Sequence, residues 1–262
     1  TLLSLTTGSN NTCVGDRAGD AITTAEANVA IGKSALGANT TGSNNVAVGK
    51  SALTTATTAS NNIAIGIEAC NVLSTGAENT IIGTYAGDAI TTGSNNTGIG
   101  RAALGAATTS SNNTAVGYFA ALNLTTASDC TFLGREAGKG VTTGSYNTAI
   151  GAESMMGAVT GTANVVVGRD GLRAITSGSY NVALGNDTNR VNTTGSYNVS
   201  IGHNALFNNT DSDNTALGYN AGNSITTGSN LTCIGYEADA SSATVNNEIT
   251  LGNNSVSTLR CQ

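Results

Sequence analysis

A glycine that recurs every 17 residues is the feature of this sequence that most restricts its fold. It stands at positions 15, 32, 49, 66, 83, 100, 117, 134, 151, 168, 185, 202, 218, 235 and 252. Every step is 17 residues except the step of 16 between Gly202 and Gly218, and no inserted domain interrupts the 15 copies. A repeat this short has no core of its own, so consecutive copies must stack to build a continuous one.

The residues before each glycine predict one short strand per copy. A Val, Ile or Leu directly precedes the glycine in every copy, and a Thr, Val or Ile stands two residues further back, as in Val29-Ala30-Ile31-Gly32. β-Branched and aliphatic residues at alternate positions are typical of a strand. The glycine itself and the recurring Thr-Thr-Gly-Ser segment predict corners. The Ala-rich stretch after the glycine predicts a second short strand, because it is too short for a stable helix.

The turn chemistry decides how these strands pair. Antiparallel hairpins favour Asn-Gly or Gly-Gly turns, and the sequence contains neither. Equal copies without such turns favour a coil, in which each strand pairs in parallel with the next at about 4.8 Å. We therefore predict an all-β fold, a parallel β-solenoid or β-roll of 15 coils. Residues 1–7 form a lead-in, residues 8–252 a single repeat domain, and residues 253–262 a junction towards a domain that the sequence does not contain.

The alternation within the strand predicts which side chains form the core. We expect the aliphatic residue before each glycine to be buried. These residues are Val14, Ile31, Val48, Ile65, Ile82, Ile99, Val116, Leu133, Ile150, Val167, Leu184, Ile201, Leu217, Ile234 and Leu251. The residue before each of them would then face outward. It is never charged, and it is alanine at Ala30, Ala47, Ala64, Ala115, Ala149, Ala183 and Ala216.

An outward column of small apolar residues predicts an interface with another copy of the chain. A mildly apolar exposed face is the alternative interpretation. Phe132 and Ile81 occupy the same column and are bulkier than such an interface readily admits.

An asparagine stands four residues before the glycine in 12 copies. These residues are Asn11, Asn28, Asn45, Asn62, Asn79, Asn96, Asn113, Asn147, Asn164, Asn181, Asn198 and Asn214. Identical amides one coil apart can form a hydrogen-bonded ladder along the stack and satisfy buried backbone groups at the corner. We predict this structural ladder; a row of ligand-binding residues is the alternative.

The sequence does not predict an enzyme, a cofactor site or a metal site. It has one histidine, His203, and no Ser/His/Asp or Cys/His set with supporting spacing. Carboxylates do not recur at a fixed repeat position, as they do in calcium-binding β-rolls. Asp20, Asp88 and the pair Asp211 and Asp213 would hold an adventitious cation at most.

Charge and cysteine spacing restrict the partners further. The net charge of −6 argues against nucleic acid, and no apolar run reaches about 18 residues, so we expect no membrane insertion. Cys13, Cys70, Cys130 and Cys233 lie at least three coils apart, roughly 14 Å along the stack. This separation exceeds the reach of a disulfide, so we expect these thiols to be free.

The motif Asn28-Val29-Ala30-Ile31-Gly32 and its copies resemble the head repeat of trimeric autotransporter adhesins. That family's shorter repeat forms a left-handed parallel β-roll in which three chains pack side by side. The longer Thr-Thr-Gly-Ser-Asn-Asn-Thr form is similar to repeats of phage tail-fibre proteins, which precede an endosialidase-type intramolecular chaperone domain. Residues 249–262 resemble the junction before that domain. The resemblance implies a left-handed homotrimeric roll.

Together these observations predict a non-enzymatic shaft or head of a fibrous surface protein. It would be a rigid extracellular rod on a virion fibre or a cell surface, and it would position or form a surface for a receptor or glycan. Two alternatives remain. The Thr-Thr pairs at 23–24, 40–41, 91–92, 108–109, 125–126, 142–143, 193–194 and 226–227 suggest ice binding. The corner residues Tyr85, Tyr118, Tyr219 and Tyr236 suggest sugar binding.

Overall fold

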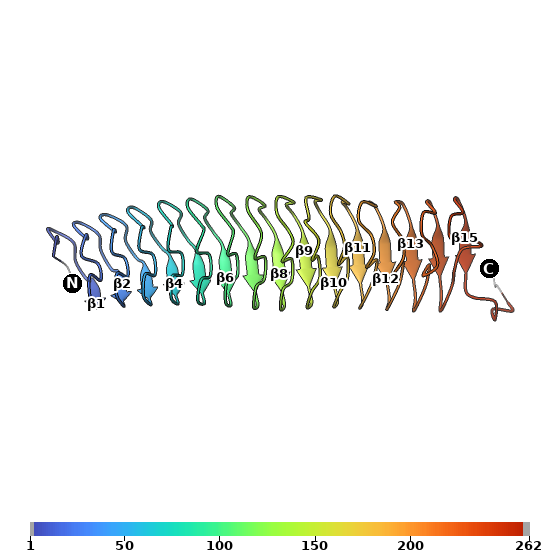
Figure 1. Ribbon diagram of the computed structural model, residues 1–262, viewed down its shortest axis with the longest axis horizontal. Helices are drawn as coiled ribbons and strands as arrows, with labels where there is room; N and C mark the ends of the chain where they lie inside the picture. Colours follow the sequence, from blue (N-terminus) through green and yellow to red (C-terminus); the bar gives the residue numbers. More distant parts are fainter. Residues whose placement is uncertain (1–2, 259–262) are drawn as a thin grey trace. The chain divides into compact units, whose positions relative to one another are not determined.

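The structure is a computed structural model that describes residues 3–258. The chain consists of two compact units, Thr1–Thr143 and Gly144–Gln262, and the described residues contain strands and turns but no helix (Figure 1). The first unit contains β1 (Thr12–Val14), β2 (Val29–Ile31), β3 (Val46–Val48), β4 (Ile63–Ile65), β5 (Thr80–Ile82), β6 (Thr97–Ile99), β7 (Thr114–Val116) and β8 (Thr131–Leu133). The second contains β9 (Thr148–Ile150), β10 (Val165–Val167), β11 (Val182–Leu184), β12 (Val199–Ile201), β13 (Thr215–Leu217), β14 (Thr232–Ile234) and β15 (Ile249–Leu251).

Within each unit, every strand pairs in parallel with the next strand in the chain. In the first unit, Thr97, Gly98 and Ile99 of β6 align with the three residues of β7, one repeat later. The second unit has the same register, as between β10 and β11. The predicted parallel β-solenoid with a 17-residue repeat is confirmed. The second short strand predicted after the glycine is wrong: the Ala-rich stretch is a turn, in which residues such as Ser34 (φ 59°) and Leu36 (φ 49°) have a positive φ that a strand does not allow. The end of the predicted C-terminal junction, residues 259–262, lies outside the described residues.

The predicted facing of the strands is wrong. The central residue of the strand lies inside the solenoid, and the seven alanines Ala30, Ala47, Ala64, Ala115, Ala149, Ala183 and Ala216 are fully buried. The aliphatic residues before the glycines face outward instead, with Val14 57% and Leu133 47% exposed. The alanine column therefore belongs to the chain's own core and is not a surface that another copy can contact.

The central strand residue can be small because the large core side chains come from the other walls of each coil. In the second coil of the first unit, Leu36 and Ala35 are fully buried after the corner glycine. Ile22 and Ile90 fill the same interior from the next segment in other coils. A roll of 17 residues per turn is narrow, so the strand that closes it has room for little more than a methyl group.

Bulky residues in the strand are accommodated by glycine on the opposite wall. Phe132 is fully buried, and a Cβ added to Gly138 would lie 2.0 Å from Cδ1 of its ring. Similarly, a Cβ on Gly19 would lie 2.5 Å from Sγ of Cys13. Several coils with alanine in the strand carry a larger residue at this place, such as Leu36 in the coil of Ala30, whereas the coil of Ala216 has Gly222 there. Paired changes of size in the coils of Cys13 and Phe132 therefore accommodate a bulky strand residue inside the core.

The single 16-residue step falls in a corner, as an intact strand pattern requires. Strands β12 and β13 keep the regular register, with Val199 opposite Thr215. The preceding coil has two threonines at this corner, Thr193 and Thr194, whereas this coil has only Thr210. The backbone N–H and the hydroxyl of Thr210 both donate to the carbonyl of Thr226. The missing residue therefore lies between Asn208 and Ser212, as the sequence predicts.

The paired core positions generate a stability prediction. Phe132→Ala should cost about 3–5 kcal/mol because it leaves a cavity in a close-packed core. Adding Gly138→Leu should recover part of that loss, because the double variant restores the pair found in other coils but places a leucine at a φ of +61°. Gly138→Leu alone should be strongly destabilising because its Cβ would overlap the Phe132 ring. Denaturant unfolding of the three variants checks this, and a double variant no more stable than Phe132→Ala would contradict it.

Candidate functional surface

The asparagine column is a hydrogen-bonded ladder inside the solenoid. Oδ1 of Asn79 accepts the backbone N–H and Nδ2 of Asn96, both at 3.0 Å. Nδ2 of Asn79 donates to Oδ1 of Asn62 and to the carbonyl of Gly93, again at 3.0 Å. The two amide hydrogens and both acceptor positions of Asn79 are thus in use, and the residue is fully buried. An amide in this arrangement has no capacity left for a ligand.

The same bonds recur along most of the asparagine column in both units; at Asn214, Nδ2 donates instead to Oδ1 of Asn209 at 3.1 Å. In the second unit, Asn164, Asn181 and Asn198 repeat the pattern. Where another residue replaces it, the preceding asparagine still accepts the backbone N–H: Asn113 from Cys130, and Asn214 from Leu231. At the last of the exceptions, Glu248 takes part in a different network and accepts the backbone N–H of Ser241 at 2.8 Å.

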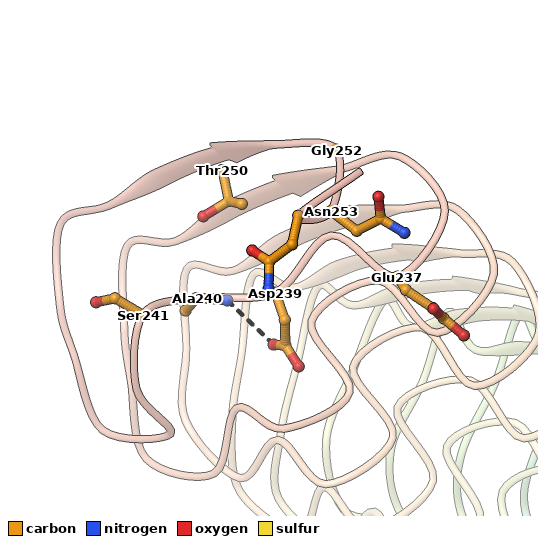
Figure 2. Close-up of a pocket in the computed structure, with 8 residues that line it drawn as sticks. Glu237, Asp239, Ala240, Ser241, Thr250, Gly252 and Asn253 are labelled. Atoms are coloured by element: carbon orange, nitrogen blue, oxygen red, sulfur yellow. Dashed lines mark hydrogen bonds between the residues drawn. The ribbon is translucent and has the colours of Figure 1, made fainter. Parts of the chain in front are cut away.

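A small cavity lies beside that last coil. It has a volume of about 330 Å³ and is lined by Glu237, Asp239, Ala240, Ser241, Thr250, Gly252, Asn253 and Asn254. Figure 2 shows the Asp239 carboxylate accepting the backbone N–H of Ala240, at 3.1 Å. Hydrogen bonds from Ser241 lower the pKa of Glu248. No group of three or more His, Cys, Asp or Glu residues in the described part of the chain could hold a metal ion.

The histidine and the cysteines of the described residues form no cluster with other metal-ligating side chains. His203 is exposed and its ring stacks on that of Tyr219, with 5.6 Å between the ring centroids. Cys13, Cys70, Cys130 and Cys233 are free thiols, as predicted. Burial raises the pKa of Cys70 to about 12, which keeps it protonated and unreactive at neutral pH.

The outer face of the strands is an exposed and largely apolar surface in each unit. Every strand presents two residues outward, the first a Thr, Val or Ile and the last a Val, Ile or Leu. None of the 15 strands contains a charged residue. The exposed fractions of the last residue are 40% at Ile31 and 38% at Ile99 in the first unit, and 45% at Leu217 in the second. Continuous exposed apolar surface of this kind marks an interaction site.

Charged and aromatic residues border this outer strand face. The position after the corner glycine carries Lys33, Lys50, Arg101 and Arg135 in the first unit. In the second unit it carries Tyr219 and Tyr236, stacked with their ring centroids 5.4 Å apart. On the other border, the rings of Tyr180 and Tyr197 stack at 5.3 Å. A polar and aromatic border around an apolar centre is typical of a protein interface.

A second regular surface is formed by the corner threonines. In the first unit the residue eight positions before each glycine is an exposed threonine in nine consecutive coils: Thr7, Thr24, Thr41, Thr58, Thr75, Thr92, Thr109, Thr126 and Thr143. The threonine or serine before each of them serves the fold, as when the hydroxyl of Thr91 donates to the carbonyl of Thr108 at 3.1 Å. The exposed row is therefore a single, unbroken column.

Comparison with known proteins gave no match. No protein-family model matches the chain, and neither a curated protein nor a solved structure does. No helix in the described residues is long and apolar enough to cross a membrane.

The outer strand face is the surface that sequence analysis missed, because the two apolar columns were assigned to the wrong sides. The sequence did contain a signal. Gly19, Gly87 and Gly138 replace a larger residue in the coils where Cys13, Ile81 and Phe132 replace alanine in the strand. Such paired changes indicate that the central strand residue and this glycine position face one another across the core.

The ladder predicts a marked cost for losing one amide. Asn79→Ala leaves the carbonyl of Gly93 without its donor and the backbone N–H of Asn96 without its acceptor. Oδ1 of Asn62 loses one of its two donors and keeps the backbone N–H of residue 79. Each such buried group costs about 1–3 kcal/mol. The matched control is Asn123→Ala, an exposed asparagine whose loss should change the stability by less than about 0.5 kcal/mol. Equal unfolding midpoints for the two variants would contradict the role of the ladder.

Proposed function

We propose that this chain is a non-enzymatic structural and adhesive module of a fibrous extracellular protein, and that it assembles with copies of itself through its outer strand face. The module positions or forms a receptor-binding surface on a virion fibre or a cell surface. The observation that supports this proposal is the pair of uncharged, exposed columns on every strand of both units.

The chemistry of the face favours a second copy as its partner. Every coil presents the same two types of residue outward, so the face carries one repeating pattern. It has no charged residue that could pair with a charge on a different protein. An identical face offers the same apolar pattern at the same spacing, and closed symmetric assemblies of identical chains are the common solution. The trimeric state is supported by the resemblance of the repeats to trimeric autotransporter heads and tail-fibre proteins.

The assembly is tested by placing a charge in the outer strand face. Ile99→Lys should shift the protein from trimer to monomer, because a buried unpaired charge at an interface is costly, while the solenoid itself stays folded. Thr92→Lys, on the exposed threonine row of the same coil, is the matched control and should leave the trimer intact. Sedimentation velocity gives the mass, and circular dichroism reports folding. A wild-type monomer at micromolar concentration would refute the assembly.

A second candidate function, ice binding, is favoured by the unbroken threonine row of the first unit. Exposed β-branched hydroxyl residues at a constant spacing of one coil suit a regular, flat ligand such as a crystal face. Thr75→Tyr should then abolish thermal hysteresis, whereas Asn123→Tyr, outside the row, should leave it unchanged. Absence of thermal hysteresis in the wild-type protein would eliminate this candidate.

A further inference from the structure

One coil of the second unit has an unusually polar interior. Asn189 occupies the core position that Leu172 holds one coil earlier and Leu206 one coil later, and all three residues are fully buried. Its backbone belongs to the regular stack, since its N–H donates to the carbonyl of Ala205 at 2.9 Å. The coil of Asn189 therefore differs from its neighbours at this position in the side chain and not in the backbone.

The amide of Asn189 has no protein partner. Neither Oδ1 nor Nδ2 makes a hydrogen bond to any described residue. Other core asparagines of the unit behave differently: Nδ2 of Asn192 donates to the carbonyl of Gly195 at 2.9 Å, and its Oδ1 accepts the N–H of Gly195 at 2.7 Å. A fully buried amide without partners is strongly unfavourable, so something must satisfy it.

The core of this coil and that of the next coil contain two further polar side chains. Thr188 and Ser200 are fully buried at core positions where neighbouring coils carry small apolar residues, such as Ala205 and Ala183. The Thr188 hydroxyl donates to the carbonyl of Gly185 at 3.0 Å, and the Ser200 hydroxyl donates to the carbonyl of Val182 at 3.2 Å. Each hydroxyl has used its single donor, and each oxygen can still accept a hydrogen bond.

We propose that an ordered water molecule is bound in the core of the second unit at Asn189, with its binding site completed by Thr188 or Ser200. A buried water requires a polar site with two to four partners. Asn189 provides one donor and one acceptor, and the hydroxyl oxygens accept a hydrogen from the water. The planar asparagine side chain has the same length as the leucine of the adjacent coils but a smaller volume, and the water would occupy the difference.

The proposal is tested on the full chain by a high-resolution crystal structure and by NMR contacts between water and the Asn189 side-chain amide. A density peak within hydrogen-bond distance of Asn189, together with such a contact, is the expected result. Asn189→Leu should remove both and raise the denaturation midpoint, because it restores the apolar column of Leu172 and Leu206. The matched control Leu172→Met conserves an apolar core and should retain the water.

Two results would overturn the proposal. One is a wild-type structure in which the Asn189 amide bonds directly to the protein and no water is present. The other is a persistent water peak in the folded Asn189→Leu variant, which would show that Asn189 does not hold it. If that variant does not fold, the wild-type crystal structure and NMR contact decide the question by themselves.

Discussion

The close approach of successive coils at the corner glycine is the constraint on which the rest of the structure depends. A Cβ on Gly100 would lie 2.3 Å from the carbonyl oxygen of Gly117, and the φ of Gly100 is +131°. Both the space and the backbone conformation therefore exclude a side chain. Because the same close approach recurs at corners such as Gly49, Gly83 and Gly168, the strands that precede the corners are held in one parallel register.

A fixed register turns each repeat position into a column, and each column carries one physical role. Amides one coil apart can bond to each other, so the ladder from Asn28 to Asn113 satisfies polar groups that would otherwise be buried without partners. The core is filled by complementary sizes, with glycine opposite Phe132 and leucine opposite alanine. The remaining columns, on the outer strand face and at the corners, are exposed and are the ones available for contact with other molecules.

The outer strand face links the fold to the proposed function. Exposed Val, Ile and Leu on successive strands support the proposed assembly, because apolar side chains are unfavourable in water, whereas the threonine row and the charged corners are compatible with water. The two units share this property, and each carries it on its own strands. Asn189 shows the opposite situation, in which a polar group lies in an apolar column and requires a partner of its own.

The sequence alone determined the repeat, the parallel pairing, the free cysteines and the position of the shortened corner, because these follow from spacing and turn chemistry. It did not determine which strand residues face inward. Both alternating sets are apolar, so periodicity is the same for either assignment, and larger residues such as Ile99 were expected inside. Only the tertiary structure decided this, because the width of the interior depends on Leu36, Ile22 and their equivalents on the other walls, which leave room at the strand for alanine.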